Sequence, residues 1–77
     1  MILSYEEARK IRDGLKCMSA KKRGFIERSM LDILGEPVHM TPEDLSIEKS
    51  LTDSQRAIYI CLITIAADER LKYENGG

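Results

Sequence analysis

The feature that most constrains the fold is an apolar stretch of eleven residues at positions 57–67, AIYICLITIAA, in which Thr64 is the only polar side chain. On a helix, which turns by about 100° per residue, this stretch has no polar side. A helix that is apolar all round is either buried on every side or spans a membrane. A membrane span needs about 20 residues, so we expect a buried core helix.

The flanks of this stretch favour a helix over a strand. Residues 52–55, TDSQ, have the spacing of a capping box, in which two side chains each bond a backbone amide of the other residue. The alternative is a buried strand, because the β-branched residues of the stretch and Tyr59 are typical of strands. No other segment alternates with period two to pair with such a strand. We therefore predict a helix over about residues 53–72.

A first helix is predicted over about residues 4–17. It begins with an S-x-x-E capping-box pattern, and Ala8, Ile11 and Leu15 follow at spacings that place them on one face. Gly14 interrupts this pattern and weakens an isolated helix by up to about 1 kcal/mol. We expect this helix to depend on tertiary contacts.

A second helix is predicted over about residues 19–34, with Ser19 as its N-cap. Gly35 and Pro37 mark its end. Glycine accepts the left-handed conformation that follows many helices, and proline cannot continue a helix.

A third, short helix is predicted over about residues 42–49, because Thr41 can cap it and proline and acidic residues occupy its first turn. Leu45 is its main apolar residue. Residues 74–77 are expected to fray. These patterns predict a single all-α domain, residues 1–77, in which three amphipathic helices pack around a hydrophobic C-terminal helix.

A chain of 77 residues has a small core and commonly needs a disulfide, a metal or self-association for stability. Cys17, Cys61 and His39 are too few for a structural zinc site. We interpret the cysteines as free thiols in a reducing cytoplasm, and the N-terminus has no signal or transit pattern. We expect a cytoplasmic protein with no metal, no cofactor and no membrane segment.

Self-association is then the remaining source of stability, and a homodimer is the simplest form. It would also cover the unused faces of the hydrophobic helix. We expect the oligomer interface at Ile58, Ile60, Leu62 and Ile63.

The charges are unevenly distributed along the chain. Residues 1–30 have a net charge of +4, and residues 31–77 have a net charge of −5. A basic edge could bind nucleic-acid phosphates, and ordinary solvated helix faces are the alternative. The residues of this candidate nucleic-acid site are Lys16, Lys21, Lys22, Arg23 and Arg28.

The acidic half instead suggests recognition of a basic protein partner, in which complementary charges set orientation and association rate. The residues of this candidate partner-binding face are Asp32, Glu36, Glu43, Asp44 and Glu48.

No catalytic site is expected. His39 stands alone in a connector, without a nucleophile or an orienting group in its sequence neighbourhood. The neighbouring carboxylates at helix ends indicate capping and solubility, and the chain has no glycine-rich phosphate loop.

Two short stretches, LTDSQ at residues 51–55 and AADERL at residues 66–71, resemble the middle of the Hha/YmoA family of small helical modulators of a nucleoid-associated silencer. The spacing between the two stretches is about one helical turn longer here, and the family's tryptophan-bearing C-terminal segment is absent. This resemblance transfers no site residues.

We therefore expect a small non-enzymatic regulator or inhibitor that binds a larger bacterial protein. Its small size is compatible with a phage or mobile-element origin. One alternative is a DNA-associated nucleoid or transcription modulator that uses the basic first half. Another is a structural subunit of a larger assembly.

Overall fold

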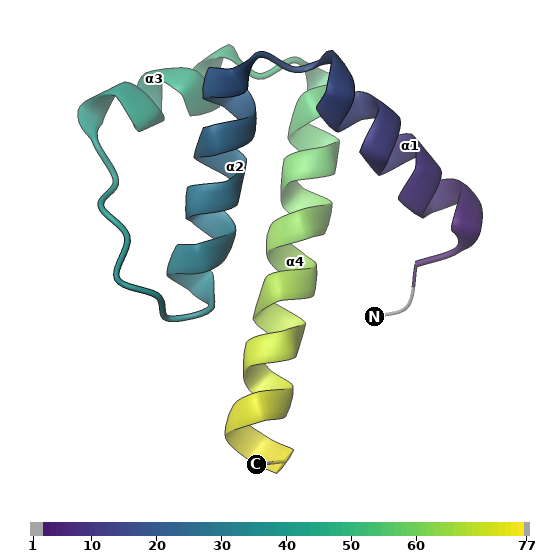
Figure 1. Ribbon diagram of the computed structural model, residues 1–77, viewed down its shortest axis with the longest axis vertical. Coiled ribbons are helices and arrows are strands. Elements are labelled where there is room, and N and C mark those ends of the chain that lie inside the picture. Colours follow the sequence, from purple (N-terminus) through teal and green to yellow (C-terminus); the bar gives the residue numbers. More distant parts are fainter. Residues whose placement is uncertain (1–2, 77) are drawn as a thin grey trace.

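The computed structural model describes residues 3–76, and these residues form four α-helices without a strand (Figure 1). This confirms the predicted all-α class. The first three helices begin and end within one residue of their predicted limits. The helices are α1 (Tyr5–Cys17), α2 (Ala20–Ile33), α3 (Pro42–Ser50) and α4 (Asp53–Gly76).

The helix starts follow from their capping residues. The Ser19 hydroxyl accepts a hydrogen bond from the Lys22 amide at 3.2 Å. At the start of α4 the predicted capping box is present in both directions: the Gln55 amide donates to Thr52 Oγ1 at 3.2 Å, and the Thr52 amide donates to Gln55 Oε1 at 3.0 Å. These bonds satisfy amides that have no partner within the helix.

Helix α2 ends as its sequence predicts. Gly35 has a φ angle of 91°, the left-handed conformation that glycine adopts without a steric penalty. The Gly35 amide donates to the Asp32 carbonyl and the Glu36 amide donates to the Leu31 carbonyl, which together form a Schellman motif.

Helix α4 continues to Gly76, beyond the predicted end at residue 72 and into the segment predicted to fray from residue 74. Arg70 Nε pairs with Glu74 Oε1 at 3.0 Å, one helical turn apart. Such pairs add a few tenths of a kcal/mol to a helix, about 0.2–0.5 kcal/mol each. Gly77 lies outside the described residues.

The helices form one layer instead of a closed bundle. In Figure 1, α4 runs down the centre, α2 lies alongside it, and α1 diverges from it on the other side. Helix α3 packs mainly on α2. The principal extents are 36 × 32 × 16 Å, and the shortest is little more than the diameter of one helix with its side chains, about 10–12 Å.

The core lies where α2, the N-terminal half of α4 and the connecting segments meet. The rings of Phe25 and Tyr59 pack with their centroids 5.2 Å apart. Ile58 and Leu62 of α4 pack against the same cluster and are partly buried. The fully buried members of this cluster are Met18, Phe25, Ile26 and Leu51.

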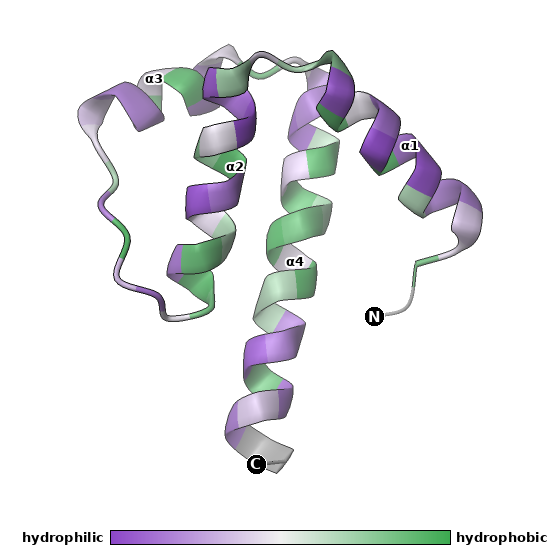
Figure 2. Cartoon of the chain, in the orientation of Figure 1, coloured by the Kyte–Doolittle hydropathy of each residue, from purple (hydrophilic) through white to green (hydrophobic). Residues whose placement is uncertain are grey.

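The prediction that residues 57–67 are buried on every side is wrong. Ala66 is buried, but Ala57 is exposed and Ile60 leaves 52% of its surface accessible. Figure 2 shows hydrophobic residues along the middle of α4, between more polar ends. A single layer covers α4 only on the side of its neighbours, so the opposite side stays open. None of the helices in residues 3–76 is long and apolar enough to cross a membrane.

Helix α1 is the least embedded helix, since none of its residues is buried. It approaches α4 at Gly14, where a β-carbon would overlap the Cδ1 atom of Ile58. The glycine that weakens this helix in isolation is therefore the residue that lets it contact α4.

Candidate protein-interaction surfaces

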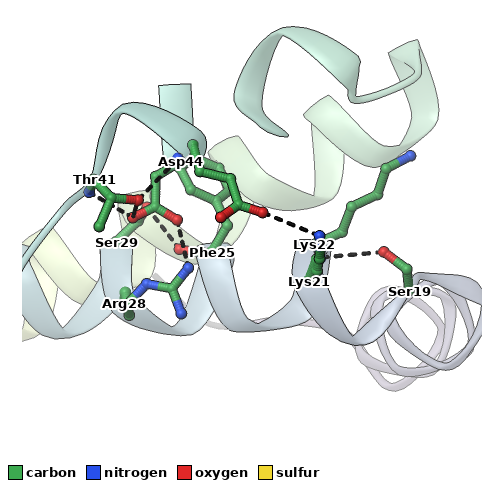
Figure 3. Close-up of polar contacts among 9 residues, drawn as sticks. Ser19, Lys21, Lys22, Phe25, Arg28, Ser29, Thr41 and Asp44 are labelled. Carbon is green, nitrogen blue, oxygen red and sulfur yellow. Dashed lines mark hydrogen bonds and ion pairs between the residues drawn. The ribbon is translucent and has the colours of Figure 1, made fainter. Parts of the chain in front are cut away.

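Helix α3 is attached to α2 by a charge pair. Asp44 is only 1% exposed, and its Oδ1 atom accepts a hydrogen bond from the Arg28 guanidinium (Figure 3). Its Oδ2 atom accepts from the Thr41 amide at 2.9 Å and from the Thr41 hydroxyl at 3.3 Å. Both carboxylate oxygens are thus bonded, which a buried carboxylate requires.

This geometry shifts the acid–base equilibria of both partners. The hydrogen bond from Arg28, assisted by the backbone bond from Thr41, lowers the pKa of Asp44 below its ordinary value. The same contact with Asp44 raises the pKa of Arg28. Asp44 therefore remains a carboxylate, and the pair remains charged, across the neutral range.

The residue that follows the buried Asp44 in α3 is exposed. Leu45, the main apolar residue of the third helix, is 61% exposed. Met40, just before α3, is 38% exposed. Ile47 supplies the apolar contact of α3 with the core instead.

The five acidic residues proposed as a partner-binding face do not act alike. Asp44 is buried in its ion pair and cannot contact a partner. Asp32 and Glu36 are exposed at the far end of α2, and Glu48 is half-buried. Glu43 is exposed and pairs with Lys21 at 3.1 Å. Among the five, Glu48 is the neighbour of the exposed Leu45, three residues further along α3.

The five basic residues proposed for nucleic-acid binding are partly used inside the molecule. Lys21 pairs with Glu43, Arg28 pairs with Asp44, and Lys22 Nζ donates to Gln55 Oε1 at 2.9 Å. Lys16 and Arg23 are exposed. Three of the five thus join α2 to α3 or α4, a structural role that sequence reasoning did not assign to them.

The four residues proposed as an oligomer interface lie on different sides of α4. Ile58 and Leu62 pack against the core cluster, Ile63 is half-buried, and Ile60 is exposed. A different set shares the open side of α4, with spacings of three, four, three and four residues. We call this set the α4 seam: Ala57, Ile60, Thr64, Ala67 and Leu71.

The spacing of the α4 seam is present in the sequence, but apolar residues on every other side of residues 57–67 mask it. Leu71, at the end of the seam, is 55% exposed. A repeat of three and four residues is the pattern of one helix that packs along another.

The chain's other reactive side chains are dispersed. Cys17 is exposed, Cys61 is half-buried, and His39 lies exposed in the connector before α3. Within residues 3–76, no group of three or more His, Cys, Asp or Glu side chains is arranged to hold a metal ion.

Comparison of the chain with protein-family models, with curated proteins and with solved structures finds no match. The short resemblance to the Hha/YmoA family therefore gains no support from a family model.

Proposed function

We propose that this chain is a small non-enzymatic regulator that binds a larger protein through the outer side of α3. The observation that supports this proposal most directly is the orientation of α3, in which a charged residue, Asp44, faces inward and Leu45 faces the solvent. An exposed leucine on a fixed helix can insert into an apolar groove of a partner, as in helix-in-groove recognition.

The ion pair between Arg28 and Asp44 prepares this surface for binding. It fixes the rotation of α3, and therefore the direction of Leu45, before any partner arrives. A surface that is ordered in advance loses less entropy on binding. Glu48 lies next to the leucine, three residues further along α3, so the fitting partner has an apolar pocket with a basic residue at its rim.

We further propose that the protein acts in the cytoplasm. The two cysteines are free thiols, which suits a reducing compartment.

The test is affinity capture with tagged wild-type protein and with the Leu45→Asp variant, each run with and without nuclease treatment. One protein retained in near-stoichiometric amount by wild type, and lost with Leu45→Asp, is the expected result. Tyr73→Asp is the matched control, because it alters an exposed hydrophobic residue that belongs to neither α3 nor the α4 seam.

Equal capture by wild type and Leu45→Asp would remove α3 as the binding surface. Capture that disappears after nuclease treatment would instead favour nucleic-acid binding through the basic first half of the chain.

A further inference from the structure

The chain exposes more surface than a folded monomer of its size. Its accessible surface is 5604 Å² for a mass of 8.8 kDa. A compact monomer of this mass is expected to expose about 4,800 Å², so roughly 800 Å² is in excess. One partner in a standard protein–protein interface buries about 800 Å². The excess is therefore the amount that one docked protein would cover.

The α4 seam is the apolar part of this open surface that is best suited to a helix. Tyr59 and Leu62 of α4 pack against the core cluster and Ala66 is buried, and on a helical wheel the seam lies roughly 140° away from these three residues. It has large residues towards its ends, Ile60 and Leu71, and small ones between them.

The one polar residue of the seam does not prevent its burial. The Thr64 hydroxyl donates a hydrogen bond to the Ile60 carbonyl at 2.7 Å. A buried hydroxyl without a partner would cost free energy, but this hydroxyl already has its bond within the helix. Thr64 can therefore be covered by an apolar surface without an unsatisfied donor.

We propose that the α4 seam binds the same seam of a second copy of this chain, with the two helices antiparallel. Antiparallel packing can place Ile60 against the second copy's Leu71, and Thr64 against the second copy's Ala67. The two small layers then lie at the centre, where the helices cross closely, and the two large layers lie outside them. Such an interface is self-complementary, as a twofold dimer requires.

Charge favours the antiparallel orientation over the parallel one. The end of the molecule near the start of α4 includes α3, the first turn of α4 and the basic residues 16–23, which Lys22 ties to Gln55. This end has six basic and four acidic residues. The opposite end, residues 31–36 and 67–74, has two basic and five acidic residues.

An antiparallel pair sets the net positive end of each copy beside the net negative end of the other. A parallel pair would instead place Glu74 opposite Glu74 and would align the two helix dipoles unfavourably. This proposal does not depend on the target proposed for α3, because the two surfaces share no residue.

The first experiment measures the mass of the protein in solution by sedimentation equilibrium at micromolar concentration. We expect a dimer for wild type. Ile60→Asp and Leu71→Asp should raise the dimer dissociation constant by about 30-fold or more, because each buries a charge in the seam. Leu45→Asp, an exposed leucine outside the seam, should leave the dissociation constant unchanged.

Circular dichroism of all three variants checks that they remain helical. A monomeric wild type would overturn the proposal. So would a dimer that Ile60→Asp and Leu71→Asp leave intact, since the second copy would then dock elsewhere.

The second experiment tests the orientation by disulfide formation in a Cys17→Ser, Cys61→Ser background. Ile60→Cys protein mixed with Leu71→Cys protein should form a cross-link between the two variants. In a parallel dimer these positions lie about 16 Å apart along the axis, and each variant would instead cross-link with itself. Cross-linking within each variant alone would therefore overturn the antiparallel arrangement.

Discussion

At the scale of single residues, the rotation of α3 is decided by one electrostatic contact. Arg28 and Thr41 bond both carboxylate oxygens of the buried Asp44, and the residue that follows it, Leu45, is exposed. An apolar residue would ordinarily take the inward position. The ion pair thus gives α3 an orientation that hydrophobic burial alone would not choose.

Replacing Asp44 with asparagine should therefore destabilise the fold much more than replacing its neighbour Glu43 with glutamine. Asp44→Asn leaves Arg28 opposite a neutral group. Glu43→Gln breaks only an exposed pair with Lys21, and such pairs contribute little. Thermal unfolding of the two variants measures this difference, and similar melting temperatures would contradict the structural role of Asp44.

The same contact predicts how stability depends on pH. The pKa of Asp44 is lower in the folded protein than in the unfolded chain. The contribution of Asp44 to the free energy of unfolding is therefore present above the pKa of the unfolded chain, about 3.9. It is lost as the pH falls through the pKa of the folded protein. Melting temperatures measured from pH 6 downwards should fall more steeply below about pH 4 for wild type than for Asp44→Asn.

At the scale of elements, the four helices depend on one another to different degrees. Helices α2 and α4 share the core, whereas α1 has no buried residue and approaches α4 at Gly14. Elements with few buried contacts open at low free energy. Helix α1 should therefore open independently of the rest.

Two alanine substitutions separate helix propensity from packing. In α2, the β-carbon of Gly24→Ala meets only Nη1 of Arg28, at 3.2 Å, whereas Nη2 makes the bond to Asp44. The substitution should therefore stabilise the protein by up to about 1 kcal/mol. Gly14→Ala should lose this gain, because its β-carbon displaces Ile58. In Gly14→Ala, the amides of α1 should exchange faster than they do in wild type, and those of α2 should exchange at the wild-type rate. Equal stabilisation by both substitutions would show that α1 does not rest on Ile58.

The helix boundaries were predictable because their signals are local. Ser19, Thr41 and Gly35 each act on amides or carbonyls within a few residues. The inward turn of Asp44 was not predictable from such signals, because its partner Arg28 lies sixteen residues earlier on another helix. The exposure of Ile60 likewise depends on how many helices cover α4, which no local pattern states.

At the scale of the whole molecule, the single layer of helices makes the stability of the fold depend on association with another chain. The hydrophobic residues that the layer buries fully are few, and the α4 seam remains open. Binding that requires the folded state stabilises it by mass action. The proposed dimer should therefore make folding depend on protein concentration.

Each tenfold increase in protein concentration should add up to about 1.4 kcal/mol to the stability of the folded dimer. The melting temperature of wild type should therefore rise with concentration. Ile60→Asp should melt at a temperature that is independent of concentration. Calorimetry over two decades of concentration measures both. A wild-type melting temperature that does not change with concentration would contradict the dimer.

The central position of α4 also fixes when the protein can fold during its synthesis. Helices α1 and α2 both rest on α4, yet α4 follows all the other helices in the chain. Domains that emerge from the ribosome early can fold while translation continues. Here Met18, Phe25 and Ile26 have no complete core to enter until α4 has been made. The nascent chain therefore cannot bury these side chains before α4 has been made, and chaperones can bind them until then.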